Sequence, residues 1–410
     1  MTPDARKLRI EDFTYDLPDE RIASHPLGDR SQAKLLQYRQ GSISEHVFRE
    51  LPALLPPDTL LISNQTRVIH ARLRVPIEGS RDIEIFCLEP LAPLDYAQSL
   101  SSTGPVTWKC LVGGNRRWKS GKATLAHHDL QLHIERGPRL DDAFRITFRW
   151  ESPAPLSFGE VLEVAGTIPL PPYLNRAAEG DDRLRYQTVF AREEGSVAAP
   201  TAGLHFTPGV LERLQLRGID WCALTLHVGA GTFKPVSSDT LADHVMHREY
   251  FSVDLSLLRR LHAQLVAGHP IVAVGTTSMR VLESLFYFGA DIHLGADAGA
   301  TLNQWVASES RFIEIEVAPA LAALIEALEQ RGQESFAGYT QLLITPGMRL
   351  RVVDGLITNF HQPRSTLLLL VAAVVGDDWR RVYDYALGHD FRFLSYGDSS
   401  LLWRRGAGAQ

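Results

Sequence analysis

The sequence predicts a mixed α/β protein with two domains, one of which is a small β-rich unit. With 410 residues, of which 45% are hydrophobic and 22% charged, the chain can bury substantial cores and is longer than one typical domain. Residues 271–288 read as strand, polar loop and helix in succession, which is typical of α/β structure. Residues 71–158 contain short alternating runs between glycine, proline and polar turns, which predicts a small β sandwich or barrel.

The first predicted strand of the α/β part is the apolar run 60–62. Polar Asn64 and Arg67 follow it, at the end of a strand where open α/β sheets commonly place ligand contacts. We therefore predict that both residues bind substrate. A strand followed by a plain turn is the alternative.

The β-rich segment carries a basic loop in which Arg116, Arg117 and Lys119 surround Trp118. Such a loop can hold phosphates and stack on a base. An exposed turn without a partner explains the same residues.

After the β-rich segment, three prolines between residues 169 and 172 fix an extended path that holds Tyr173 near the return to the α/β part. We predict that Tyr173 binds substrate, and a rigid linker is the alternative. Two loops rich in small residues then follow, at 198–206 and 227–233. Each carries one histidine, His205 or His227, beside glycines that allow the backbone to approach a ligand closely. We predict that the loops are two walls of one pocket, with these residues contacting a cofactor: Thr201, Gly203, Gly229 and Gly231. Alternatively, the glycines only form turns and the histidines are satisfied polar groups.

Between these loops, Thr207 and Pro208 predict a helix start and Gly218 a helix end. In the strand predicted at 219–228, alternation puts His227 on the face opposite its most apolar side.

The strand 271–274 leads through a tight loop at 275–277 into a helix predicted at 279–288. Free N–H groups at such a helix start attract anions. Thr276, Thr277 and Arg280 are therefore predicted to hold an anionic group of a cofactor. A well-capped helix packed on a sheet is the alternative, although it does not require the arginine.

Residues 349–361 predict a β-hairpin that turns at Asp354 and Gly355. His361 follows it, and Ser365 caps an apolar helix predicted at 366–375, which would place Arg364 at the cleft edge. Near the C-terminus, an acid, a phenol and a cation lie close together and are predicted to bind a charged amine and a base edge; these are Arg392, Tyr396 and Asp398. A hydrogen-bonded surface turn is the competing interpretation.

His244 and His247, three residues apart, would align on a helix and suggest a metal site. We predict no metal, because the HExxH order is missing. The three cysteines form no CxxC pair and are expected to be reduced. Since the longest apolar run is too short to span a bilayer and no secretory segment opens the chain, we expect a cytoplasmic protein.

Six long motifs occur in a fixed order along the chain: DFTYDLPDERIASHPLGDR, AAPTAGLHF, TLHVGAGTFKPV, VGTTSMRVLES, LITNFHQPRSTLLLLV and FRFLSYGDSSLL. Together they resemble the S-adenosylmethionine:tRNA ribosyltransferase-isomerases of queuosine biosynthesis. The resemblance implies a discontinuous larger α/β domain, residues 1–70 and 159–410, with a small antiparallel β-barrel domain inserted at 71–158.

The resemblance also implies the reaction. The ribosyl group of S-adenosylmethionine would be transferred to 7-aminomethyl-7-deazaguanine in the anticodon loop of tRNA, giving epoxyqueuosine-tRNA, adenine and methionine. S-adenosylmethionine would be a co-substrate, no metal would be needed, and the enzyme is expected to act as a monomer. Histidines near neutral pKa suit the proton transfers, so we predict His205, His227 and His361 as catalytic.

The chain departs from the family pattern at Gln65, at His70 and across 290–333. These departures leave open a paralogue that uses S-adenosylmethionine on another RNA or nucleoside. A non-enzymatic RNA-binding protein is the alternative from a different class. The net charge of -6 excludes a uniformly basic surface, although a local basic face is enough for tRNA.

Overall fold

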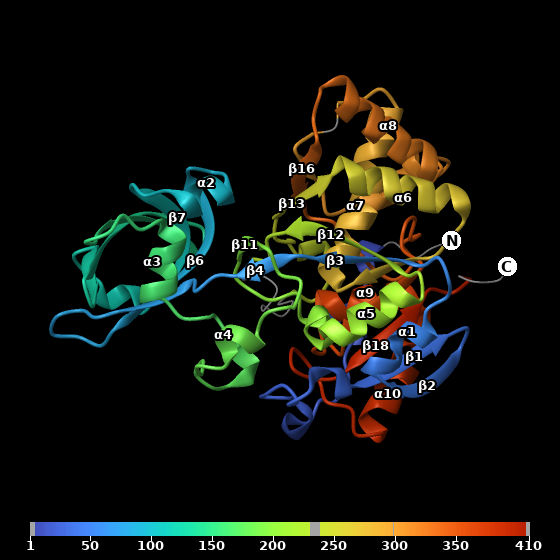
Figure 1. Cartoon of the computed structure of the whole chain (residues 1–410), viewed down its shortest axis with the longest axis horizontal. Helices are drawn as coiled ribbons and strands as arrows, with labels where there is room; N and C mark the ends of the chain where they lie inside the picture. The colour runs from blue at the N-terminus through green and yellow to red at the C-terminus, as the bar shows by residue number, and fades with distance from the viewer. Residues whose placement is uncertain (1–4, 230–237, 298, 407–410) are drawn as a thin grey trace.

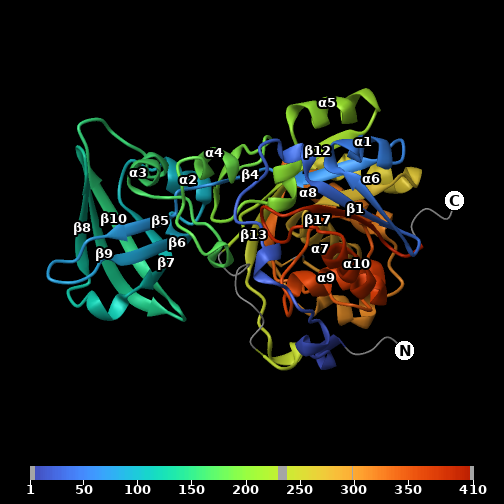
Figure 2. The same cartoon turned by 90° about the horizontal axis from the view of Figure 1, so that it is seen from below.

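The computed structural model describes residues 5–229, 238–297 and 299–406. A mixed α/β unit and a smaller antiparallel β-barrel unit lie side by side, and the barrel projects from one side of the larger unit (Figures 1 and 2). Segments on both sides of the barrel in the sequence build the α/β unit. The predicted fold class, a discontinuous α/β domain with an inserted barrel, is confirmed.

One mixed sheet forms the centre of the α/β unit. Its strands lie in this order: β15 (Thr301–Leu302), β16 (Ser335–Thr340), β13 (Glu249–Asp254), β12 (Asp220–Leu226), β3 (Leu60–Asn64), β14 (Ile271–Val274), β17 (Gly355–Asn359), β18 (Ser399–Trp403), β1 (Lys34–Arg39) and β2 (Ser42–Val47). The four central strands β12, β3, β14 and β17 are mutually parallel, so their carboxyl ends share one edge of the sheet.

Alternate residues of the central strands pack into two cores, one on each face of the sheet. In β14, Ile271 and Ala273 belong to one core, and Val272 and Val274 belong to the other. Because both faces are covered, these strands are continuous apolar runs rather than alternating ones.

Helices cover the sheet on both faces. Their bounds are α1 (Leu51–Leu54), α5 (Pro208–Leu216), α6 (Leu255–Ala267), α7 (Thr276–His293), α8 (Val317–Gln330), α9 (Thr366–Val375) and α10 (Trp379–Gly388), with the short α4 (Asp182–Arg185) near the barrel. The predicted cap at Thr207 is confirmed, since its side chain accepts the N–H of Val210. So is the cap at Ser365, which accepts the N–H of Leu368.

The segment 290–333 contributes helix α8, which packs on α7 and adds a further helix to one side of the α/β unit. Helix α8 packs against α7 so closely that a Cβ on Gly289 would lie 2.2 Å from the carbonyl oxygen of Ala320. Glycine is therefore required at this helix crossing, because any side chain would push the helices apart.

The barrel is one antiparallel sheet in the order β5 (Arg72–Val75), β6 (Ile83–Ala92), β7 (Val106–Gly113), β10 (Ala143–Glu151), β9 (Leu130–Leu140) and β8 (Lys122–His127). The sheet curls until its edge strands β5 and β8 approach each other. Two helices, α2 (Tyr96–Ser101) and α3 (Phe158–Ala165), pack on it.

Where the insert ends in the sequence stays a prediction. Phe158, Val161 and Leu162 of α3 are buried in the same core as the barrel strands. This packing favours a boundary after α3 rather than at residue 158. A short parallel pair, β4 (Thr66–Val68) and β11 (Glu193–Ser196), lies where the two units meet.

Two predicted elements are wrong. The hairpin at 349–361 does not form: β17 pairs with β14 and β18, and the carboxylate of Glu283 in α7 accepts the N–H groups of Arg351, Val352 and Val353 at 2.8 to 3.0 Å. The loop predicted at 275–277 is shorter, because α7 already begins at Thr276.

Candidate active site

Several residues predicted to be functional meet at the carboxyl edge of the parallel strands. His227 follows β12, Thr276 follows β14 and His361 follows β17. Parallel strands bring their carboxyl ends together, which explains why motifs far apart in the sequence meet here.

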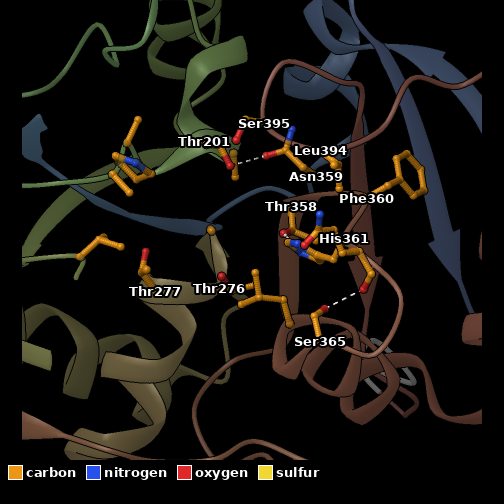
Figure 3. A pocket seen from close by; sticks show the side chains of 18 of the residues that line it. Thr201, Thr276, Thr277, Thr358, Asn359, Phe360, His361, Ser365, Leu394 and Ser395 are labelled. Atoms are coloured by element: carbon orange, nitrogen blue, oxygen red, sulfur yellow. Dashed lines mark hydrogen bonds between the residues drawn. The ribbon is translucent and has the colours of Figure 1, made fainter. Parts of the chain in front are cut away.

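A pocket lies at this edge, which we call the strand-end pocket (Figure 3). Its polar lining consists of hydroxyl, amide and imidazole groups: Tyr173, Tyr186, Thr201, Thr276, Thr277, Thr358, Asn359, His361, Gln362, Ser365 and Ser395. Its apolar lining includes Val228, Phe360 and Leu394. None of the described residues that line it carries a charge, apart from a protonatable imidazole.

Two helices begin at the strand-end pocket. Thr276 and Thr277 open α7, and Ser365 caps α9. The first N–H groups of a helix have no partner within it and carry a partial positive charge. The Oγ1 atom of Thr277 is also buried without a hydrogen-bond partner among the described residues. The arrangement suits a carboxylate.

His361 is held firmly on the pocket wall. Its Nε2 lies 2.8 Å from Oγ1 of Thr358, and its backbone N–H donates to the hydroxyl of Tyr383 at 3.0 Å. Within the described structure, Nδ1 has no hydrogen-bond partner. Burial lowers the pKa of His361 to about 3, so its imidazole is neutral at physiological pH.

Asn359 joins the strand-end pocket to His205. Its Oδ1 accepts a hydrogen bond from the hydroxyl of Thr201 at 2.8 Å, and its Nδ2 lies 3.2 Å from Nε2 of His205. His205 stands behind Asn359, against the ring of Phe48, and burial lowers its pKa to about 4. Among the described residues His205 does not line the pocket itself, and it is linked to the pocket through Asn359.

His227 faces a second hollow, the interdomain cleft between the barrel and the α/β unit. Its ring stacks on Tyr96 of α2, with centroids 4.0 Å apart and an angle of 6° between the planes. Burial lowers the pKa of His227 to about 4, and its Nδ1 has no hydrogen-bond partner among the described residues. Gly229 lines the same cleft.

Arg280 points away from the strand-end pocket. Its guanidinium forms a buried ion pair with Glu249, which lines the interdomain cleft. The predicted contact between Arg280 and a cofactor carboxylate therefore has no support from the geometry of the strand-end pocket.

The predicted substrate residues near β3 and β17 lie apart from one another. Asn64 ties β3 to β12 through hydrogen bonds with the backbone of Leu226. Arg67 lies in a surface hollow beside His70 and pairs with Glu194 at 3.3 Å. Arg364 is exposed.

The three C-terminal residues predicted to bind substrate, Arg392, Tyr396 and Asp398, form contacts with other residues of the protein. Asp398 is 2% exposed and pairs with Arg392 at 3.0 Å, while Tyr396 donates to Asp182 at 2.8 Å. Arg392 and Tyr396 line a small hollow together with His205. Of the predicted substrate residues, Tyr173 does reach the strand-end pocket, where its hydroxyl lies 2.5 Å from that of Ser395.

The remaining predictions concern glycines and metal ligands. A Cβ on Gly203 would lie 2.7 Å from the ring of Phe190, so packing against protein requires this glycine. Gly231 lies outside the described residues. His244 and His247 lie between helical and strand segments rather than on the helix considered for them. Among the described residues, no group of three His, Cys, Asp or Glu side chains is arranged to hold a metal ion.

Some site residues were not predicted. Thr358 and Ser395 lie within motifs singled out in the sequence, but their types are too common to stand out. Tyr96, Tyr250 and Tyr339 line the interdomain cleft from three different elements. No sequence signal places them together, because Tyr96 belongs to the inserted unit.

Sequence comparison places the chain among known proteins. Residues 10–402 match the family described as queuosine biosynthesis protein. Relatives named S-adenosylmethionine:tRNA ribosyltransferase-isomerase are 37% identical in Desulfitobacterium hafniense, covering 96% of this chain and 100% of the relative, and 39% identical in Sphingopyxis alaskensis, covering 98% of both.

A crystal structure of the S-adenosylmethionine tRNA ribosyltransferase from Thermotoga maritima is also similar, with 28% identity, a TM-score of 0.46, and coverage of 95% of this chain and 99% of that one. The family match spans nearly the whole chain, including all six motifs. This chain therefore belongs to the queuosine biosynthesis protein family.

Proposed function

We propose that this protein is an S-adenosylmethionine:tRNA ribosyltransferase-isomerase. It transfers and isomerises the ribosyl group of S-adenosylmethionine onto 7-aminomethyl-7-deazaguanine in tRNA, and releases adenine and methionine. The family membership supports the reaction class. We assign this reaction to the strand-end pocket. The observation that supports the assignment is that two helices begin there beside neutral polar groups.

The residues of the strand-end pocket fit S-adenosylmethionine. The starts of α7 and α9 and the unpartnered hydroxyl of Thr277 would hold its carboxylate. Neutral hydroxyl groups and the rings of Tyr173 and Phe360 would surround its positively charged part without a repelling cation.

When bound, S-adenosylmethionine supplies an acidic C–H bond beside its sulfonium and two leaving groups. The protein has to move protons and exclude water. His361, neutral and with Nδ1 free of partners in the described structure, is placed to accept or return a proton in the pocket. His205 holds the amide of Asn359, and this amide in turn orients the hydroxyl of Thr201. His227 lines the interdomain cleft instead.

One chain supplies both hollows, so we propose that a monomer is the active form, and that it acts on tRNA in the cytoplasm. The structure contains no membrane-spanning candidate among the helices of its described residues.

Adenine release tests the function. Purified protein is incubated with S-adenosylmethionine and tRNA carrying 7-aminomethyl-7-deazaguanine, and adenine and methionine are measured by chromatography. We expect both products in equal amounts, and none with tRNA carrying the unmodified guanine. Release with another RNA or nucleoside alone would identify a paralogue. Tight tRNA binding that is indifferent to S-adenosylmethionine, without release, would identify an RNA-binding protein.

A further inference from the structure

The interdomain cleft is a second built hollow, with a volume of about 460 Å³. The barrel contributes Glu89, Tyr96 and Lys109, and the α/β unit contributes His227, Glu249 and Tyr250. Its lining differs from that of the strand-end pocket, because it combines aromatic rings with charged groups.

The rings form a platform across the two units. Tyr96 stacks on His227, and Tyr250 lies nearly parallel to His227, with centroids 5.8 Å apart and 20° between the planes. Tyr339 meets Tyr250 edge-on, with centroids 5.4 Å apart and 65° between the planes, and the guanidinium of Arg248 lies over its ring, 4.1 Å from the centroid. Flat aromatic surfaces of this kind stack on planar bases of any sequence.

The cleft contains the carboxylates of Glu89 and Glu249 beside the cations Lys109 and Arg248, and the carboxylates can accept hydrogen bonds from a ligand. The guanidinium of Arg280 donates a hydrogen bond to Oε2 of Glu249. The other carboxylate oxygen, Oε1, has no partner within the described structure. Glu89 pairs with Lys109 at 3.1 Å, but both side chains stay partly exposed, at 29% and 26%. Carboxylates accept strongly from amines and from paired ring and exocyclic N–H groups.

The cleft adjoins the strand-end pocket through two elements. After β12, Val228 lines the strand-end pocket, whereas His227 and Gly229 line the cleft. In α7, Thr277 lines the pocket, and Arg280, one turn later, binds Glu249 of the cleft. Neighbouring residues of the same two elements therefore line both hollows.

We propose that the interdomain cleft is the binding site for the target nucleobase of the RNA, turned out of its stack, with its amine directed toward the strand-end pocket. This inference rests on the proposed function and names the place of its second substrate. Enzymes that modify a base commonly extrude it into such a pocket. The loop first considered for stacking cannot serve, since Trp118 is 1% exposed and its Nε1 donates to the carbonyl of Lys122.

Substitutions at the platform test the proposal. Tyr250→Ala and Tyr339→Ala are compared with Tyr385→Ala, a matched control in α10 whose partly buried ring stacks on His389 and lines neither hollow. We expect the KM for the modified tRNA to rise about tenfold or more in the two cleft variants. The Kd for S-adenosylmethionine should stay within about twofold of wild type in all three.

Glu89→Gln tests recognition of the base edge on the barrel side of the cleft. Equilibrium dialysis with free 7-aminomethyl-7-deazaguanine, and with the 7-deazaguanine that lacks the aminomethyl group, measures the preference for the amine. We expect wild type to prefer the amine-bearing base, and Glu89→Gln to bind both bases more weakly while it keeps that preference. Both assays use the full chain, and thermal melting checks that each variant is folded.

The outcomes separate the two proposals. A wild-type protein that releases adenine, while folded cleft variants keep the wild-type KM for tRNA and bind the free base normally, overturns the cleft proposal alone. A wild-type protein that releases no adenine contradicts the proposed function. Dialysis of the free base then still decides whether the cleft binds it.

Discussion

The Nδ2 of Asn359 lies 3.2 Å from the Nε2 of His205, while the Oδ1 of the same amide accepts the hydroxyl of Thr201. Because the amide nitrogen is a donor, Nε2 of His205 must be an acceptor and its proton resides on Nδ1. One amide at the end of β17 thus fixes the tautomer of a buried histidine and the orientation of a hydroxyl in the strand-end pocket.

Replacing Asn359 with Asp should change His205 measurably. A carboxylate at this place favours the protonated imidazole, so the pKa of His205 should rise from about 4 toward its ordinary value near 6.5. NMR titration of the ring measures this. Asn359→Ala is the control: it removes the same hydrogen bonds without adding charge, so the pKa should stay low. An unchanged pKa in Asn359→Asp would contradict the contact.

Thr277→Val should weaken S-adenosylmethionine binding without weakening the fold. The buried hydroxyl of Thr277 has no partner among the described residues, so removing it costs the free protein nothing, whereas a bound carboxylate loses one donor. We expect the Kd to rise about fivefold, measured by calorimetry, and the melting temperature to stay the same or rise.

Ser284→Ala provides the matched control in α7. It breaks internal hydrogen bonds to the carbonyl of Arg280 and to Thr340, away from the pocket. It should lower stability and leave the Kd unchanged. The reverse pattern in the two variants would place the ligand elsewhere.

His361→Ala should reduce kcat by about 100-fold or more, which is typical for the loss of a proton-transfer group. Thr358→Val, which removes only the partner of Nε2, should reduce kcat less while leaving the Kd for S-adenosylmethionine near wild type. His205→Ala, which removes a partner of Asn359, and His227→Ala, which removes a ring of the interdomain cleft, should also reduce turnover, by less than His361→Ala, while the proteins stay folded. Near-normal turnover in any of the three would remove that histidine from the mechanism.

The buried histidines predict how stability depends on pH. The pKa values of His205 and His227 are lowered to about 4 and that of His361 to about 3, so the unfolded chain binds protons below pH 6.5 that the native protein does not. The free energy of unfolding should therefore fall as the pH drops from about 6.5 to 4, by up to about 3 kcal/mol for each imidazole.

Urea unfolding at pH 7.5, 6 and 5 measures this dependence. Carboxylates such as Asp182, whose pKa is lowered by its bonds to Arg176 and others against the effect of burial, lose their contribution only below about pH 4. Burial raises the pKa values of Glu283 and Asp291, so these two carboxyl groups act in the opposite direction between pH 6.5 and 4. The loss of stability of the wild type is therefore compared with that of His205→Ala, which should be smaller by the contribution of this one imidazole. An equal loss in both proteins would show that His205 can be protonated in the folded protein.

Local patterns were enough to predict much of the fold. The caps at Thr207 and Ser365 and the strand 271–274 depend on neighbouring residues, and the structure has them as predicted. The prediction of a hairpin at 349–361 was wrong because of a long-range contact. Glu283, distant in sequence, accepts the backbone N–H groups that would have paired in the first strand of the hairpin.

The candidate site could be predicted only in part, for the same reason. Thr276 and His361 follow parallel strands, and strand ends meet at one edge, so their proximity follows from the fold class. The pairing of Arg280 with Glu249 and the stacking of Tyr96 on His227 depend on contacts between elements, the latter between two units, which no local pattern specifies.

A crystal structure of the protein with S-adenosylmethionine bound tests the central claim most directly. We predict that the methionine carboxylate lies against the N–H groups of Thr276 and Thr277 in the strand-end pocket, with His361 within hydrogen-bonding distance of the ribosyl or sulfonium region. S-adenosylmethionine bound in the interdomain cleft, or on another surface away from these residues, would contradict the account.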